Sequence, residues 1–205
     1  MLIIGVDEIV LRAIRKWPDV PAVYGWLGLD RRGNWSIKGE RIANPALASF
    51  IARNYGRDEV GRWFFQNGPQ RVFVTLAYVP YVYRTLPLES GGCGLSAHTG
   101  VPVEAPGAAW LDDGGAVLVE TELGIGVVHD LDLPELLGFV SGPGGEPLED
   151  GAIERFLLPP GANSGTAKVA LCGHALSLKH IHSSEVPARF RFVRDPRPAP
   201  GEPDC

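Results

Sequence analysis

One pattern of residues occurs twice in the sequence and limits what the chain can fold into. Residues 24–37 read YGWLGLDRRGNWSI, and residues 108–120 read AAWLDDGGAVLVE. Each stretch is typical of a strand, a polar turn and a return strand, and a helical pattern follows each of them. The period of roughly 85 residues is too long for a solenoid. The pattern therefore predicts an internal duplication, with two copies of one small domain.

A short helix is expected before the first copy, where apolar residues recur at helical spacing over residues 7–17 and a proline follows. A hairpin over residues 22–40 then leads to a helix that starts at Asn44, a favoured N-cap residue, and Pro45, which suits the first helical position. Three further strands are expected over residues 62–66, 70–78 and 81–86. The first unit is predicted to be β-β-α-β-β-β.

The second copy repeats this order. A capping-box pattern, in which Asp132 lies three residues before Glu135, opens a helix, and strands are expected over residues 168–182 and 188–193. We predict an α+β fold of two related units, each a curved, mostly antiparallel sheet with one helix, plus the short N-terminal helix. The predicted boundaries are a first unit over residues 1–88, a linker over 89–103, a second unit over 104–194 and a disordered tail over 195–205.

The composition and charge of the chain argue against several classes of function. Its 205 residues are 45% hydrophobic and 21% charged, which is enough to bury a core. The formal net charge of −5 provides no basic stripe for a phosphate backbone, so we expect no nucleic-acid partner. No run approaches the roughly 20 apolar residues that a membrane helix needs, and the first residues lack a signal-peptide pattern. With three widely spaced cysteines and no disulfide framework, we expect a cytoplasmic protein.

Several short motifs of glycine, tryptophan, proline and aliphatic residues occur in the first half of the chain: Gly33-x-Trp35, Gly39-x-x-Ile42-x-x-Pro45-x-Leu47, Gly61-x-Trp63, Gly68-Pro69 and Val72-x-Val74. Over roughly residues 25–83, this set resembles an uncharacterised proteobacterial family of unknown function. The resemblance implies a cytosolic α+β protein of two related units with a role in signalling or ligand sensing. It supplies no catalytic residues.

The candidate ligand-binding residues are Lys38, Arg41, Gln70 and Arg71. Lys38 is expected on the outer face of its strand, and Arg41 precedes the positively polarised start of the helix at Pro45. Gln70 and Arg71 begin a later strand. Such a surface suits a small carboxylated or phosphorylated ligand, and the alternative is a set of solvated charges on the outside of a sheet.

A second candidate site consists of Cys172, His174, His180 and His182, residue types that bind zinc. All four would share one face of an uninterrupted strand over residues 168–182, but the first and last would then lie roughly 33 Å apart. A shared metal therefore requires a bend near Gly173 or Ser177. Polar residues on a solvated strand are the alternative.

Cys93 lies among glycines with His98 nearby, an arrangement that permits a thiol nucleophile with a base, or simply a linker. The paired acidic residues have structural explanations, because Asp112, Asp113, Asp130 and Asp132 fall at turn and cap positions. Four tryptophans fall in strand patterns and are expected in the core. They are Trp26, Trp35, Trp63 and Trp110.

These observations favour a non-enzymatic, cytosolic ligand-sensing or protein-interaction module, with its site between the two units and no cofactor. A small anionic ligand or a protein is the expected partner. The alternative is an enzyme, either a metal-dependent hydrolase that uses zinc at the late histidines or a thiol enzyme at Cys93.

Overall fold

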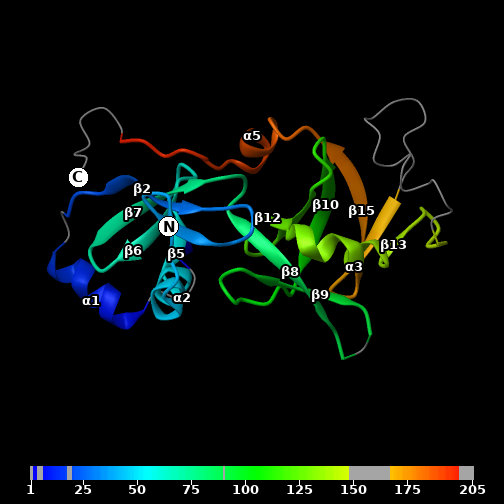
Figure 1. The fold of residues 1–205 in the computed structure, drawn as a ribbon, viewed down its shortest axis with the longest axis horizontal. Coiled ribbons are helices and arrows are strands. Elements are labelled where there is room, and N and C mark those ends of the chain that lie inside the picture. Colours follow the sequence, from blue (N-terminus) through cyan, green and yellow to red (C-terminus); the bar gives the residue numbers. More distant parts are fainter. Residues whose placement is uncertain (1, 4–6, 18–19, 90, 148–166, 199–205) are drawn as a thin grey trace. The chain divides into compact units, whose positions relative to one another are not determined.

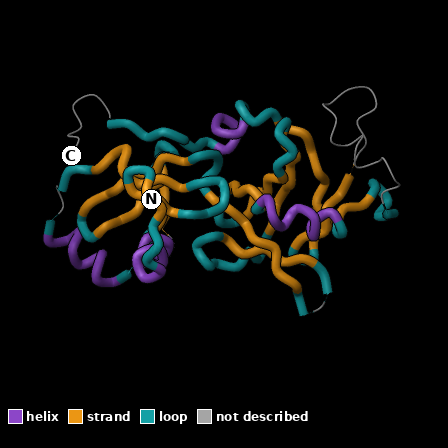
Figure 2. The backbone as a smooth tube through the Cα atoms, viewed as in Figure 1, coloured by secondary structure: helices purple, strands orange, loops and turns teal. Residues whose placement is uncertain are grey.

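The structure is a computed structural model that describes residues 2–3, 7–17, 20–89, 91–147 and 167–198. The chain divides into two compact units, unit 1 with residues 1–80 and 187–205 and unit 2 with residues 81–186. In the described part of each unit more residues lie in strands than in helices, and the helices are short (Figures 1 and 2). None of the helices in these described residues is long and apolar enough to cross a membrane.

Within the described residues, unit 1 holds a seven-stranded sheet in the order β1-β5-β6-β7-β2-β3-β4. Its elements are β1 (Leu2–Ile3), α1 (Glu8–Lys16), β2 (Val23–Leu29), β3 (Trp35–Ile37), β4 (Glu40–Arg41), α2 (Pro45–Arg53), β5 (Tyr55–Arg57), β6 (Trp63–Asn67) and β7 (Gln70–Leu76). Neighbouring strands are antiparallel except β2 and β7, which pair in parallel at the centre. The predicted helices and hairpin are confirmed, and the Asn44 side chain accepts hydrogen bonds from the N–H groups of Ala46 and Leu47.

Unit 2 holds, within its described residues, an eight-stranded sheet in the order β13-β14-β15-β10-β11-β12-β8-β9. Its elements are β8 (Tyr81–Pro87), β9 (Cys93–Ala97), β10 (Pro106–Asp112), β11 (Val117–Thr121), β12 (Ile125–Val128), η1 (Asp130–Asp132), α3 (Leu133–Leu137), β13 (Val140–Ser141), β14 (Ala167–Leu171) and β15 (His174–Ile181). A short helix, α5 (Val186–Phe190), follows β15.

The two sheets share one arrangement of six strands. In space, β5-β6-β7-β2-β3-β4 of unit 1 matches β13-β14-β15-β10-β11-β12 of unit 2, and in each set the first and last strands along the chain pair in parallel. Asp30 and Asp112 occupy matching positions at the end of the first strand, and Oδ1 of each accepts hydrogen bonds from the N–H groups two and four residues later. The prediction of an α+β fold with two related units is confirmed.

The boundaries of the units differ from the predicted ones. β8 pairs with β12 and with β9, so the segment expected to end unit 1 belongs to unit 2, and residues 93–97 form a strand where a linker was expected. The chain after residue 186 belongs to unit 1, where the N–H of Leu76 donates to the carbonyl of Arg194. Alternating apolar residues identify a strand but do not reveal which sheet it joins. Of the predicted disordered tail, residues 199–205 lie outside the described residues.

Two late segments also differ from the prediction. Cys172 and Gly173 have φ angles of 50° and 78° and form a tight turn, so β14 and β15 are a hairpin and not one strand. The strand expected over residues 188–193 instead begins inside helix α5, because Pro187 suits the first turn of a helix.

Both sheets curl. In unit 1 the rings of Trp35 on β3 and Tyr55 on β5 meet at 5.1 Å, although three strands separate β3 from β5 in the sheet. In unit 2 the N–H of Cys172, after β14, donates to the carbonyl of Cys93 on the opposite edge strand at 2.7 Å. The inner face of the unit 1 sheet, which carries Leu27 and Leu29, is buried; the other is called the outer face below.

Candidate ligand-binding site

A cavity of about 330 Å³ lies on the outer face of the unit 1 sheet, over the parallel pair β2 and β7. Its volume is near the lower end of the range of small-molecule sites, roughly 300–1,000 Å³. Gly28 pairs with Ser36 on one side and with Thr75 on the other, so these three residues share the outer face. The lining includes Gly25, Trp26, Gly28, Ser36, Gly39 and Thr75.

Trp26 is the aromatic residue of this cavity, and its position corrects the expectation that it is a core residue. Its side chain is 46% exposed. Because side chains alternate along a strand, burial of Leu27 and Leu29 turns Trp26 to the outer face. Trp35, Trp63 and Trp110 are buried as predicted.

Lys38 places a positive charge beside this ring. It lies in the turn between β3 and β4 with a φ of 49°, and its N–H donates to the carbonyl of Trp26 at 2.7 Å. Its Nζ lies 3.7 Å from the centroid of the Trp26 ring. An ammonium over an indole face is held by the ring quadrupole, so the cation stays close to the cavity.

Glycines form much of the cavity wall, which leaves backbone atoms accessible. No atom lies within 4 Å of the position that a Cβ would take at Gly25 or Gly39. At Gly28 an added Cβ would lie 2.8 Å from Oγ of Ser36. The register of β2 against β7 shifts between Val23 and Leu27, a bulge that interrupts the backbone ladder beside the cavity.

Asp30 is the acidic residue of the lining. Burial alone would raise its pKa, but hydrogen bonds from Asn34 and Arg32 and the charge of Arg41 lower the pKa below its usual value. Its two oxygens accept bonds from the N–H groups of Arg32 and Asn34 and from the Asn34 side chain. The Asp30 carboxylate therefore stabilises the turn between β2 and β3.

The four residues predicted to bind a ligand do not line a single cavity. Lys38 contacts the ring of Trp26, which lines the first cavity, whereas Arg71 lines a second cavity of about 310 Å³ beside Arg62. The Gln70 side chain donates to the carbonyl of Pro21 at 3.1 Å. Arg41 is exposed on β4. A role for each in binding stays a prediction.

Cys93 lacks the features of an activated thiol. It is buried in β9, and burial, followed by the charge of nearby Glu135, raises its pKa to about 11. His98 lies five residues further along, roughly 16 Å at the rise of a strand. Nδ1 of His98 accepts a hydrogen bond from the N–H of Val82. The thiolate that nucleophilic chemistry needs is therefore disfavoured here.

The four residues of the predicted zinc site divide between the two ends of the β14–β15 hairpin. Cys172 and His174 lie at its turn, and His180 and His182 lie roughly 20 Å away at the other end of β15. Nδ1 of His174 is 2.9 Å from the carbonyl of Cys172, and Nε2 of His182 is 3.2 Å from a carboxylate oxygen of Asp113. Among the residues that the structure describes, no group of three or more His, Cys, Asp or Glu side chains could hold a metal ion.

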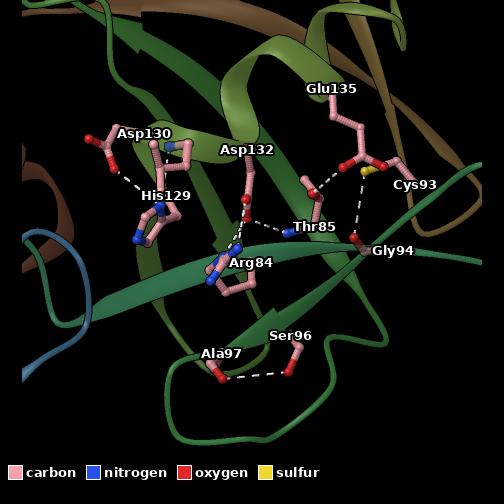
Figure 3. A network of polar contacts seen from close by, with 11 residues as sticks. Arg84, Thr85, Cys93, Gly94, Ser96, Ala97, His129, Asp130, Asp132 and Glu135 are labelled. Atoms are coloured by element: carbon pink, nitrogen blue, oxygen red, sulfur yellow. Dashed lines mark hydrogen bonds and ion pairs between the residues drawn. The ribbon is translucent and has the colours of Figure 1, made fainter.

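A polar network in unit 2 joins β8 to η1 and α3 (Figure 3). Arg84 donates to Asp132 through Nε at 2.6 Å and through Nη2 at 2.9 Å, and the N–H of Thr85 donates to the same carboxylate at 3.0 Å. The Thr85 hydroxyl donates to Glu135 at 3.1 Å. The Asp132 side chain thus binds β8 and does not cap α3. The His129 side chain caps η1, because it accepts a hydrogen bond from the N–H of Leu131.

The pKa of Asp132 makes this network sensitive to acid. Burial would raise the pKa, but the hydrogen bonds from Arg84 and Thr85 lower it below the usual value. A carboxyl group with a lowered folded pKa contributes stability above its unfolded pKa, near 3.9, and loses that contribution as the pH falls through the folded pKa.

We expect the Asp132→Asn substitution to reduce the free energy of unfolding by about 2 kcal/mol at neutral pH, because charge-assisted hydrogen bonds of a buried group are lost. Asp130→Asn, at an exposed neighbouring carboxylate, is the matched control and should change it by less than about 0.5 kcal/mol. Urea unfolding followed by circular dichroism measures both. The difference between Asp132→Asn and the wild type should shrink between about pH 5 and about pH 2, and a constant difference would contradict the assignment.

Comparison with known protein families identifies the group to which the chain belongs. A family described as "Protein of unknown function (DUF2946)", with the name DUF2944, matches residues 6–197. The chain belongs to this family. The predicted resemblance to a family of unknown function is confirmed to that extent, and the predicted role in signalling stays a prediction. No protein with a curated description matches the sequence.

Two solved structures resemble this member of the family. One is a DUF1285 family protein from Silicibacter pomeroyi DSS-3, with 16% identity, a TM-score of 0.54 and coverage of 85% of this chain and 87% of the other. The second is a DUF1285 family protein from Shewanella baltica OS155, with 15% identity, a TM-score of 0.43 and coverage of 55% and 90%. The first likeness shows a shared fold, and at these identities it shows nothing more.

Sequence reasoning missed Trp26 and the glycines around it as parts of this site. The signal was present, because strict alternation with Leu27 and Leu29 places Trp26 on the face opposite the core. Arg62 was also missed. It directly precedes β6, and its side chain reaches Tyr24, which lies 38 residues earlier in the chain. No local pattern predicts that contact.

Proposed function

We propose that this protein is a non-enzymatic ligand-binding module, and that the cavity beside Trp26 takes a small anionic organic molecule. The observation that carries the proposal is the pair of Lys38 and Trp26, in which an ammonium and a half-exposed indole meet at a cavity. The ring offers an apolar surface to a flat group of the ligand, and the ammonium offers a counter-charge to its carboxylate or phosphate.

The wall of the cavity supports binding of a compact ligand. A ligand can approach the backbone closely where a residue has no side chain, and Gly25, Gly28 and Gly39 provide such positions. The backbone and the hydroxyls of Ser36 and Thr75 supply hydrogen-bonding groups that fix orientation. Sensing or signalling would be the use of this binding, and cytoplasmic location, a protein partner and a site between the units stay predictions.

The test is isothermal titration calorimetry of the purified protein with two ring compounds. Benzoate supplies a carboxylate, and adenosine monophosphate supplies a phosphate. We expect at least one to bind, and the double substitution Trp26→Ala with Lys38→Ala to weaken its binding about tenfold, because a cation and a stacking surface are both lost.

The chain offers a matched control in a second lysine–tryptophan pair. Nζ of Lys16 lies 4.5 Å from the Trp17 ring centroid, and this pair does not line either cavity described above. Trp17→Ala with Lys16→Ala should leave the affinity unchanged. Equal weakening by both double substitutions, or binding unaffected by either, would refute the proposed site.

We also infer that the two units arose by internal duplication. The shared order of six strands and the matching Asp30 and Asp112 turns support this origin. With Asp30 matched to Asp112, the buried Trp110 of unit 2 occupies the position of Gly28, which lines the cavity in unit 1, so the proposed site belongs to one copy.

A further inference from the structure

Three aromatic rings pack together on the outer face of the unit 1 sheet. Tyr24 stacks on Phe73 with centroids 4.6 Å apart, and Phe64 meets Phe73 edge to face at 5.8 Å. All three are buried. Two guanidinium groups cover them, with Arg62 4.5 Å from the Phe73 centroid and Arg71 4.8 Å from that of Phe64. Two cations from neighbouring segments therefore lie over one apolar surface.

Arg62 is held rigidly. Its Nε donates to Asp58 at 2.7 Å, and its Nη1 donates to the hydroxyl of Tyr24 at 3.1 Å. Asp58 is fixed in turn, because its Oδ1 accepts the N–H groups of Val60 and Arg62. The loop from Asp58 to Arg62 is closed by backbone bonds at both ends. A guanidinium fixed in this way loses little conformational entropy when it binds a ligand.

The second cavity, of about 310 Å³, opens beside these groups and is lined by Asp58, Glu59, Val60, Arg62 and Arg71. The side chains of Asp58 and Arg62 are 10% and 19% exposed, and each is the other's partner. Arg71 comes from β7 and brings a second guanidinium to the same space. Planar guanidinium groups match the oxygens of a phosphate through paired N–H donors, and two of them suit a doubly charged anion.

We propose that this second cavity binds a phosphate group, with Arg71 as its main ligand and Arg62 as the second guanidinium. The site is separate from the cavity of Trp26. Two carboxylates also line the cavity: Asp58 is paired with Arg62, and the negative charge of Glu59 opposes an anion. Removal of the Glu59 charge should therefore strengthen phosphate binding. If the arginines had only a structural role, removal of this charge would not change phosphate binding.

The test is calorimetric titration of the full chain with inorganic phosphate at constant ionic strength, with acetate in a parallel series. Every titration uses the Lys38→Ala background, which removes the cation of the first cavity. Arg71→Gln should weaken phosphate binding about tenfold, and Glu59→Gln should strengthen it a few-fold. Arg57→Gln, at an exposed arginine of the same sheet outside the cavity, is the control and should have no effect.

Circular dichroism and the thermal midpoint without phosphate establish that each variant folds. Should Arg71→Gln fail to fold, Arg71→Lys replaces it, and this variant should weaken binding by a smaller factor because it keeps the charge and loses the paired donors. Equal phosphate affinity in the Lys38→Ala protein with and without the Arg71 substitution overturns the site. Equal responses to acetate and phosphate overturn the assignment of a phosphate group. Failure of the Trp26 proposal leaves these outcomes unaffected.

Discussion

The Gly126→Ala variant is expected to lose about 3 kcal/mol of unfolding free energy, a large fraction of the stability of a domain of this size. Gly126 lies on β12 beside β8, where it pairs with Tyr81. An added Cβ would overlap Cε2 of Tyr83 and lie 2.6 Å from its Cδ2, closer than carbon atoms approach in folded proteins.

The Tyr83 ring has no room to move away. It is fully buried, it stacks at 6.0 Å on Tyr81, and its hydroxyl hydrogen-bonds to Oγ1 of Thr121 at 2.7 Å and to the carbonyl of Gly124 at 2.9 Å. A shift of the ring would break these bonds and leave a buried hydroxyl without a partner. A shift of β12 would break its pairing with β8. This pairing joins the β8–β9 hairpin to the rest of the sheet.

Chemical denaturation measured by circular dichroism tests this prediction, with Gly107→Ala as the control. Gly107 lies on β10 of the same sheet, and the nearest atom to an added Cβ is 3.7 Å away, so we expect a change below about 0.5 kcal/mol. A double-mutant cycle identifies the cause. The cost of Gly126→Ala should fall sharply in a Tyr83→Ala background, and an unchanged cost would show that the ring is not responsible.

Local signals predicted the elements of this fold well. Asn44 and Pro45 predicted the start of α2, because helix capping and the fixed φ of proline depend only on residues close together in the sequence. The repeated strand-turn-strand pattern predicted the two related units, since Asp30 and Asp112 each close their turn through their own following N–H groups.

Contacts between distant residues account for what the sequence did not predict. The pattern around Asp132 indicated a cap, but Arg84 binds its carboxylate from 48 residues away. β8 alternates as expected of a strand, and only its pairing with β12 assigns it to unit 2. The turn at Cys172 lacks the Asn-Gly or Asp-Gly pair that usually signals a tight hairpin, so the hairpin looked like one long strand.

The candidate site depends on distant contacts in the same way. Alternation placed Lys38 on the outer face of a strand, but Lys38 lies in the turn between β3 and β4 with a φ of 49°, and its Nζ lies over the Trp26 ring. The exposure of Trp26 and the glycines of the cavity wall depend on how distant segments of the chain pack, which a local sequence pattern does not reveal. Arg71 was identified from its charge, whereas its place over the Phe64 ring depends on the pairing of β6 with β7.

The Gly28→Val variant should abolish ligand binding at the Trp26 cavity while the protein stays folded. Gly28 lies in the wall between Ser36 and Thr75, with no φ in the left-handed region, so a β-branched residue fits its extended backbone. The atom nearest to the new Cβ is Oγ of Ser36 at 2.8 Å, the end of a short side chain that can rotate away. The isopropyl group then occupies space that the ligand needs.

We expect the affinity for the ring compound that binds the wild type to fall at least about a hundredfold, because the ligand and the valine side chain compete for one volume. The thermal midpoint should change little, since valine is a better strand residue than glycine and offsets the contact with Ser36. Gly107→Val is the matched control on β10 of unit 2, the strand that corresponds to β2, and it should bind like the wild type. A folded Gly28→Val protein that keeps full affinity would place the ligand elsewhere, because no molecule can share the volume that the side chain fills.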